Sequence, residues 1–154
     1  MEIGQLTPQE TPWLMDRSVA TGWAQLVPQQ QAQTTPAVVA AQVQGMLQHS
    51  LSQPGSAVLV ARENGMPVGY LVVTVVPDEL TRMPTGLFID IWVEPAWRGK
   101  GISSQLTAAG ESHLKRLGVK AVRRMIAAHN APSLRHARAD GCQLERYMLI
   151  KPLS

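Results

Sequence analysis

Hydrophobic residues gather in three segments near the middle of the chain, where their pattern is typical of β-strands. Residues 56–62, 68–76 and 86–93 are dominated by apolar and β-branched side chains, as expected of strands with at least one buried face. Asn64 and Gly65 separate the first two segments, and an Asn-Gly pair is a strong signal for a hairpin turn. We therefore predict three central strands, of which the first two form a hairpin.

Before these strands, apolar positions recur at helical spacing instead. Thr7 and Glu10 have the spacing of a capping box, which marks the start of a first helix. Pro36 is placed to open a second helix, whose apolar side continues to Leu51. Residues 27–36 between the two helices are polar and bounded by prolines, so we predict a loop there.

The rest of the pattern completes a mixed α/β chain. Its order is β-α-α-β-β-β-α-β-α-β, which predicts an α/β fold of the α+β kind with one mixed sheet. No internal repeat or domain boundary interrupts this order, so we expect one domain over residues 1–154. The further predicted elements are a strand over residues 1–7, a helix over 101–117, a strand over 119–128, a short helix over 132–139 and a last strand over 147–153.

Length and cysteine content narrow the class of protein. A chain of 154 residues buries roughly two thirds of its unfolded surface, so it can form a sizeable core. Cys142 is the one cysteine, which excludes a disulfide framework within the chain and fits a reducing compartment. The first ten residues do not have the pattern of a signal peptide, and no apolar run approaches the ~20 residues of a membrane span. We expect a cytoplasmic protein without a membrane partner.

Charge is distributed unevenly along the chain. Residues 97–154 contain eleven Lys and Arg against three Asp and Glu, a net charge of +8. Residues 1–96 contain three against eight, a net charge of −5. This asymmetry favours an anionic ligand on the second half. Nucleic acid is the rival anion, but the basic residues are spread over several elements and few aromatic residues could stack on bases, so we expect no nucleic-acid partner.

Residues 93–103, VEPAWRGKGIS, join the third central strand to the next helix. Gly99 and Gly101 lack the Cβ atoms that would keep a phosphate away from the backbone, while Arg98 and Lys100 add positive charge. The unpaired N–H groups at the start of a helix also attract anions. The spacing fits neither a Walker loop nor a dinucleotide-binding fingerprint. We therefore predict a cradle for a phosphate or pyrophosphate group.

The segment IDIWVEPAWRGKGISSQL resembles the acetyl-CoA-binding signature of the Gcn5-related N-acetyltransferase (GNAT) superfamily. In that signature a strand ending in Val-x-Pro precedes Arg/Gln-x-x-Gly-x-Gly/Ala and a helix, and residues 93–95 and 98–103 fill these places. Ser103 departs from the usual Gly or Ala. Asn130, followed by Gly141, resembles the second half of the family, where an Asn opens a helix that ends in Gly-Phe. The resemblance implies a GNAT-like fold with a splayed central sheet and acetyl-CoA as co-substrate.

In such a fold the pyrophosphate of CoA would lie on the N–H groups of the loop, and the pantetheine arm would pair with the third central strand. The following strand would splay from that edge near residues 125–127, and we expect a bulge that frees further backbone groups. No metal is expected, because His129 and His136 have no third ligand of matching spacing. The resemblance assigns cofactor binding to Ile91, Val93, Arg98, Gly99, Lys100, Gly101, Ile102, Ser103 and Asn130.

Asp90 is the candidate catalytic residue. It lies in an otherwise apolar strand, where an isolated charge is costly. Polyamine-type members of the superfamily carry a Glu-Asp pair before an aromatic-Val step, and Ile89-Asp90 matches the aspartate but not the glutamate. One interpretation is that Asp90 orients or deprotonates an acceptor amine. The other is that it pairs with an arginine such as Arg124 for structural reasons.

The residue that protonates the departing CoA thiol is not evident from the sequence. In many relatives a tyrosine seven residues after the Asn has this role, but the same count from Asn130 reaches Ala137. The substitutes that stay open are His136, Ser133, Cys142 and Tyr147.

The resemblance implies an N-acetyltransferase that moves acetyl from acetyl-CoA to a primary amine of a small molecule or peptide by direct attack. Asp78, Glu79 and Asp90 would favour a cationic amine if they line the acceptor pocket. The alternative is a CoA-binding regulatory or interaction module without turnover, which the missing tyrosine favours. A dimer is common in the superfamily, so a homodimer is among the expectations.

Overall fold

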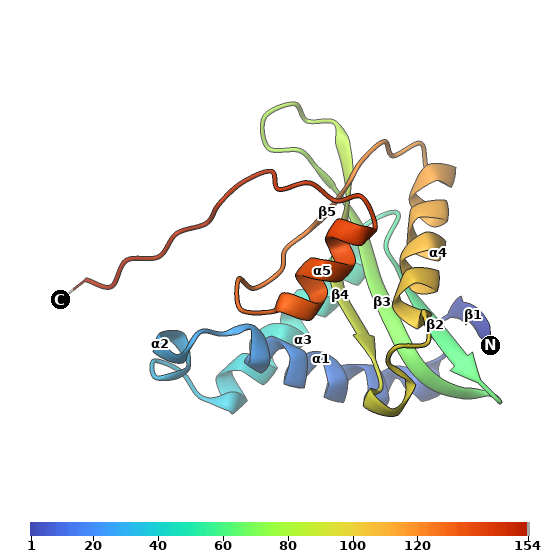
Figure 1. Cartoon of the computed structure of the whole chain (residues 1–154), viewed down its shortest axis with the longest axis horizontal. Coiled ribbons are helices and arrows are strands. Elements are labelled where there is room, and N and C mark those ends of the chain that lie inside the picture. The colour runs from blue at the N-terminus through green and yellow to red at the C-terminus, as the bar shows by residue number, and fades with distance from the viewer. Residues whose placement is uncertain (154) are drawn as a thin grey trace.

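The computed structural model describes residues 1–153, which form one five-stranded sheet with helices on both faces (Figure 1). The strands, in the order in which they lie in the sheet, are β1 (Glu2–Gln5), β2 (Ala57–Glu63), β3 (Met66–Pro77), β4 (Pro84–Val93) and β5 (Val122–Arg124). The first four pair antiparallel, whereas β5 pairs parallel to β4. The predicted mixed α/β fold class is therefore confirmed.

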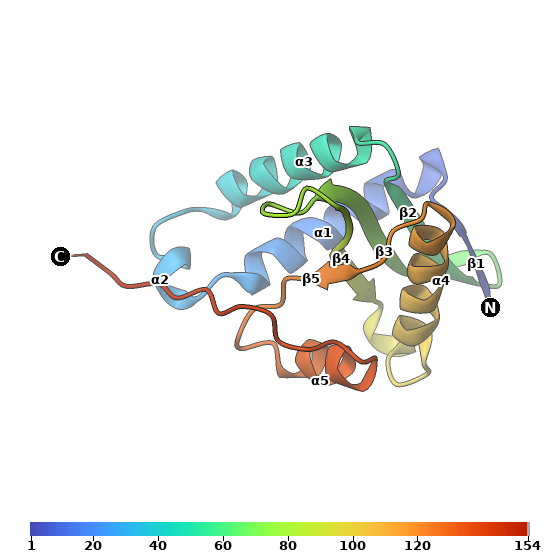
Figure 2. The same ribbon diagram turned by 90° about the horizontal axis from the view of Figure 1, so that it is seen from above.

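Helices cover both faces of the sheet, with α1 and α3 on one face and α4 and α5 on the other (Figure 2). Strand β3 is buried on both sides, because Tyr70 and Val72 face α1 and α3 while Leu71 and Val73 face α4. The helices are η1 (Pro8–Glu10), α1 (Thr11–Gln25), α2 (Pro28–Gln31), α3 (Pro36–Ser52), η2 (Pro95–Trp97), α4 (Ile102–Arg116) and α5 (Ala131–Ala139).

The N-terminal half follows the predicted order, with one correction. The capping box is present, since the Thr7 N–H donates to Glu10 Oε2 at 2.8 Å. The loop predicted over residues 27–36 is partly wrong, because it contains the short helix α2. Pro28 presets the backbone angle of a first helical position, and the Gln30 side chain accepts from the Val27 N–H at 3.1 Å. The proline at the helix start was the available signal.

Strand β4 contains a bulge, as expected, but it lies at Ile89 and not between Asp90 and Trp92. Val72 pairs with Asp90 and Val73 pairs with Phe88, so Ile89 is an extra residue without a partner on β3. The bulge changes which side chains face which helices. Phe88 packs in the cluster against α4, whereas Asp90, two residues later, turns toward α1 and the buried Tyr70. Without the extra residue, Phe88 and Asp90 would share one face.

Strands β4 and β5 pair only briefly and then separate. The register runs from Gly86 with Val122 to Phe88 with Arg124, and no residue beyond Arg124 continues the strand. The strand predicted over residues 119–128 is therefore shorter than expected. The far half of β4 is left without a strand on this side, which agrees with the splayed sheet that the sequence implied.

The last predicted strand, residues 147–153, is wrong. This segment has no regular structure, and it extends away from the sheet (Figure 1). Its attachment comes earlier, where Arg123 of β5 donates to both carboxylate oxygens of Glu145 at 2.7 and 2.8 Å. An apolar run becomes a strand only where a neighbouring strand can pair with its backbone, and residues 1–153 provide none there.

Candidate active site

The loop after β4 builds an open cradle at the N-terminus of α4. Gly99 and Gly101 both have φ of +75°, a left-handed conformation that favours glycine. A Cβ built on either residue would have no atom within 4 Å, so the backbone conformation, and not crowding, requires glycine here. Gly101 is also the N-cap of α4, which begins at Ile102. The two glycines turn the chain sharply from the sheet into the helix.

Several backbone N–H groups of this cradle have no hydrogen-bond partner within residues 1–153. The first helical bond runs from Gln105 N–H to Gly101 O at 3.1 Å, and no hydrogen bond within residues 1–153 uses the N–H groups of Ile102, Ser103 or Ser104. A cavity lies in front of them. The positive end of the α4 dipole and three free donors therefore point to one place, which suits an oxyanion or a pyrophosphate.

Two cations flank the cradle, held by aromatic rings. The Arg98 guanidinium lies 4.7 Å from the centre of the Trp92 ring, and its Nε donates to the Val93 carbonyl at 2.9 Å. The Lys100 ammonium lies 4.3 Å from the centre of the Trp97 ring. Of the predicted cofactor residues, Lys100 is the one that lines neither cavity of the site. Its charge remains close to the cradle, because neighbouring residues of the same loop line it.

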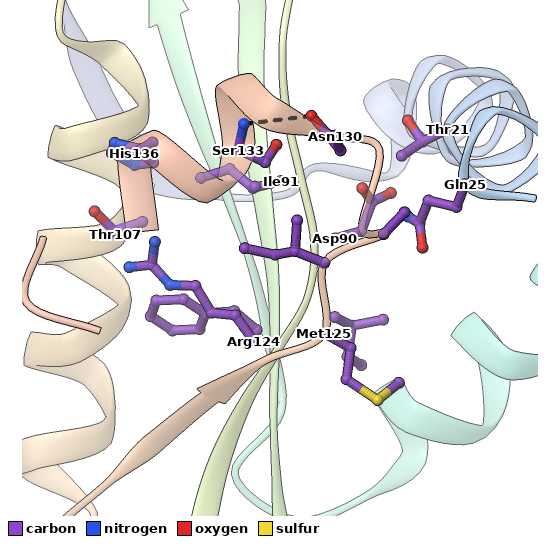
Figure 3. A pocket seen from close by; sticks show the side chains of 14 residues that line it. Thr21, Gln25, Asp90, Ile91, Thr107, Arg124, Met125, Asn130, Ser133 and His136 are labelled. Atoms are coloured by element: carbon purple, nitrogen blue, oxygen red, sulfur yellow. Dashed lines mark hydrogen bonds between the residues drawn. The ribbon is translucent and has the colours of Figure 1, made fainter. Parts of the chain in front are cut away.

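A second cavity adjoins the first where β4 and β5 separate, and α5 lies across it (Figure 3). Asn130 lines it and caps α5, because Asn130 Oδ1 accepts from the Ser133 N–H at 3.3 Å. Ile91 lines the middle of this cavity, and Val93 lines the cradle, so the predicted cofactor residues of β4 border both spaces. The geometry brings the cradle, the free edge of β4 and the start of α5 together.

Asp90 lies at one end of this cavity in a buried hydrogen-bonded chain. The Tyr70 hydroxyl donates to Asp90 Oδ2 at 2.6 Å, and Ser18 Oγ lies 3.1 Å from the same hydroxyl. Burial raises the pKa of the Asp90 carboxyl above its ordinary value, although the Tyr70 hydrogen bond acts in the opposite direction. Burial and the neighbouring Asp90 also raise the pKa of Tyr70, which keeps its proton. This partner was not among the predicted site residues, although a lone tyrosine in an apolar strand was the available signal.

Arg124 does not pair with Asp90, so that structural interpretation of Asp90 is wrong. The Arg124 guanidinium instead forms an ion pair with Asp140 and lies 5.2 Å from the centre of the Phe88 ring. It borders the same cavity, at the opposite end from Asp90 (Figure 3). The hydrogen-bond partner of Asp90 is therefore the neutral Tyr70 hydroxyl, which Ser18 contacts in turn, and no positive charge compensates the carboxylate there.

Unpaired buried polar atoms concentrate at this cavity. Within residues 1–153, four buried side-chain atoms have no hydrogen-bond partner, and three of them line it: Asp90 Oδ1, Arg124 Nε and His136 Nε2. Buried polar atoms are almost always paired, because an unpaired one costs about 1–3 kcal/mol. The concentration of exceptions indicates a place where a polar ligand supplies the missing partners.

Other candidate residues have structural roles. His113 Nε2 lies 2.8 Å from the Gly55 carbonyl oxygen, as expected of a satisfied helix histidine. Asp78 accepts from Arg123 at 2.5 Å and from the backbone of Leu80 and Thr81, so it staples a loop and does not line the cavity. Among residues 1–153, no cluster of His, Cys, Asp and Glu is placed to hold a metal ion.

This fold is also the fold of several acetyltransferases of known structure. A proposed acetyl transferase from Pyrococcus furiosus superposes with a TM-score of 0.80 at 17% identity, covering 99% of this chain and 100% of that one. The ribosomal-protein-alanine N-acetyltransferase from Brucella melitensis superposes with a TM-score of 0.69 at 15% identity, with 99% and 100% covered. The aminoglycoside N-acetyltransferase AAC(6')-Iy in complex with CoA superposes with a TM-score of 0.68 at 17% identity, covering 99% of this chain and 100% of that one.

The chain belongs to the acetyltransferase (GNAT) family, whose sequence profile matches residues 20–141. A search of curated protein sequences gave no match. The family membership confirms the predicted resemblance, and it identifies the chain as an N-acetyltransferase enzyme. This outcome favours the enzyme over the alternative of a CoA-binding module without turnover.

Proposed function

We propose that this enzyme transfers acetyl from acetyl-CoA to a primary amine that enters the cavity at the Asp90 end. The observation that carries the proposal is the buried, unpaired Asp90 Oδ1, which lines a cavity adjoining the anion cradle. A buried carboxylate oxygen without a donor is a suitable acceptor for the N–H of an ammonium or amine.

The cradle supports acetyl-CoA as the co-substrate. The free N–H groups of Ile102 and Ser103 and the open space over Gly99 and Gly101 fit a pyrophosphate, since a Cβ at either glycine would project into unfilled space. The free edge of β4 at Ile91 and Val93 offers backbone groups to an extended arm, and Asn130 borders the same path. When bound, acetyl-CoA supplies an acetyl group activated as a thioester.

Asp90 is suited to act as a base on the amine. Its carboxyl has a raised pKa because of burial, which brings its proton affinity closer to that of a general base working near neutral pH. The Tyr70 hydroxyl holds Oδ2, so Oδ1 is the oxygen available to an acceptor. In this proposal Asp90 orients the amine and takes the proton that it loses during direct attack.

The acceptor is a small amine or an N-terminal peptide group. Asp90 is the acidic residue that lines the cavity, and the neutral Thr21 and Gln25 lie beside it (Figure 3). The two other acidic candidates have partners, because Asp78 accepts from Arg123 and Glu79 from Arg146. One negative charge favours a monoamine over a polycation.

The test is release of CoA thiol from acetyl-CoA across a panel of amines, amino acids, aminoglycosides and N-terminal peptides, with Asp90→Asn beside the parent. We expect turnover on one class and a loss of about 10²–10⁴-fold in kcat/KM for the variant, the usual contribution of a general base. Asp16→Asn is the matched control, since Asp16 is an exposed carboxylate paired with Arg17. Full activity of Asp90→Asn would contradict the proposal, as would the absence of thiol release with every amine.

The proposal also includes three expectations from the sequence. They are one domain over residues 1–154, a cytoplasmic location and a homodimer. Within residues 1–153 no helix combines the length and apolarity needed to cross a bilayer. Gel filtration with light scattering would test the dimer, because it gives the mass of the particle directly.

A further inference from the structure

His136 occupies the boundary between the two cavities of the site. It is the one residue that lines both the cradle and the cavity between β4 and β5. Its Nε2 is buried and has no hydrogen-bond partner within residues 1–153. Figure 3 shows the ring beside Thr107, at the end of the cavity away from Asp90. A titratable nitrogen without a hydrogen-bond partner in residues 1–153 thus lies between the anion cradle and the acceptor end.

We propose that His136 Nε2 donates the proton that the departing CoA thiol requires. The inference rests on the proposed function, since it concerns the same reaction. A ligand that begins in the cradle and ends near Asp90 must pass the boundary at which His136 lies. Asp90 and His136 then serve opposite ends of one transfer, with the amine at Asp90 and the sulfur at His136.

The other residues of the site are poorer proton donors. Ala137, which takes the place of the family's usual tyrosine, has no ionisable group and is only 5% exposed. Tyr147 is 81% exposed and lines neither cavity. Tyr70 already donates to Asp90, and the Arg124 guanidinium is too weak an acid to release a proton.

Two further candidates are also less suitable. Cys142 is half-buried after the C-terminal end of α5 and lines neither cavity. Ser133 lines the cavity, but an aliphatic hydroxyl is a much weaker acid than the phenol of a tyrosine and does not readily protonate a thiolate. Histidine changes its charge most readily between pH 5 and 8, which makes it the most common proton donor in enzymes.

With Asp90 and His136, every proton that moves in the transfer has a donor and an acceptor. The carbon–nitrogen bond forms as the carbon–sulfur bond breaks, and the bonding electron pair remains on sulfur. His136 Nε2–H gives its proton to that sulfur, and Asp90 takes the proton that the amine nitrogen loses. Solvent then returns a proton to His136 and removes one from Asp90. The fixed charges that border the two cavities besides these groups are Arg98 and Arg124, the latter balanced by Asp140.

The first experiment needs no acceptor. The thiol of CoA bound to the protein is titrated by thiolate absorbance in a Cys142→Ala background, where CoA carries the only thiol. We expect His136→Leu to raise the pH midpoint of the bound thiol by about one unit, because an N–H donor or positive charge near the sulfur stabilises the thiolate and leucine supplies neither. Calorimetry should give the same CoA affinity for both proteins within about threefold. Equal midpoints, or loss of CoA binding in the variant, would overturn the inference.

The second experiment uses an acceptor identified by the amine panel. His136→Gln should lower kcat about 10²-fold with acetyl-CoA, but only a few-fold with the selenoester analogue, whose more acidic selenol leaves without a proton. His49→Gln, on the exposed last turn of α3, is the matched control. An equal loss with both donors would show a structural role and would contradict the inference. A parent without turnover would contradict the proposed function instead, while the thiol titration would still decide the role of His136.

Discussion

The two ends of the site are constructed in different ways. Apart from His136, the cradle is one continuous stretch, residues 93–104, in which two left-handed glycines and a helix start present backbone N–H groups. The Asp90 end joins Ser18 of α1, Tyr70 of β3 and Asp90 of β4, three residues far apart in the chain. The first end depends on local backbone geometry, and the second depends on which elements pack together.

This difference has an energetic consequence. Backbone donors at a helix N-terminus remain whatever the neighbouring side chains are, so the cradle tolerates substitutions that preserve its two glycines. The Asp90 end depends on individual side-chain atoms in a buried setting, where each lost partner leaves another polar atom unpaired. We therefore expect sharper effects from single substitutions at the Asp90 end.

Tyr70→Phe should produce the largest of the predicted stability changes. It removes the donor to Asp90 Oδ2 and leaves Ser18 Oγ without its partner, so we expect about 1–3 kcal/mol less stability in chemical denaturation. Because the Tyr70 hydrogen bond lowers the pKa of Asp90, its removal should raise that pKa further. The acid limb of the pH–rate profile should then move to higher pH. An unchanged profile would show that Asp90 is not the titrating base.

Gly101→Val should damage the cradle and leave the Asp90 end intact. A β-branched residue at φ +75° costs roughly 1–2 kcal/mol of backbone strain, and its side chain would enter the space over the cradle. We expect acetyl-CoA affinity, measured by calorimetry, to fall by about tenfold or more. The pH–rate profile at saturating acetyl-CoA should keep its parent shape. A shifted profile would show that the two ends are coupled.

Asp90→Asn should change stability less than Tyr70→Phe does, and it should make the protein more stable at neutral pH. The folded-state pKa of Asp90 is raised by burial, so the folded protein binds more protons than the unfolded chain in the range just above the unfolded value of about 3.9. The carboxylate therefore costs stability at neutral pH, and this cost disappears as the pH falls below about 4. We expect the thermal midpoint of Asp90→Asn to exceed that of the parent at pH 7 and the difference to vanish in acid. A variant less stable than the parent at pH 7 would contradict this.

Removal of all residues after Arg146 should have the smallest effect. Tyr147, Met148 and Leu149 are 81%, 94% and 89% exposed, so they bury little apolar surface. We expect the free energy of unfolding of the monomer to stay within about 0.5 kcal/mol of the parent, as for surface changes in general. A large loss would show that this segment packs against a second copy in solution, which light scattering on both proteins would reveal.

Much of the fold and half of the site could be predicted from the sequence. The three central strands and the glycine cradle follow from patterns of a few neighbouring residues, because backbone angles and helix-start hydrogen bonds are local. The helix start at Asn130 was implied by the family resemblance. The strand over residues 147–153 failed because apolar character alone does not provide a pairing partner. The short helix α2 was not predicted, because its residues are polar and the proline at its start also fits the boundary of a loop.

The sequence by itself determined the family, the cradle and the presence of a costly aspartate in β4. Only the tertiary structure decided that Asp90 bonds to Tyr70 and not to Arg124, and that His136 lies where the two cavities meet. The reason is that burial and long-range partners depend on how α1, α5 and the sheet pack around the bulge in β4. The backbone geometry of the cradle depends on neighbouring residues, whereas the environment of a buried charge forms only when distant segments pack together.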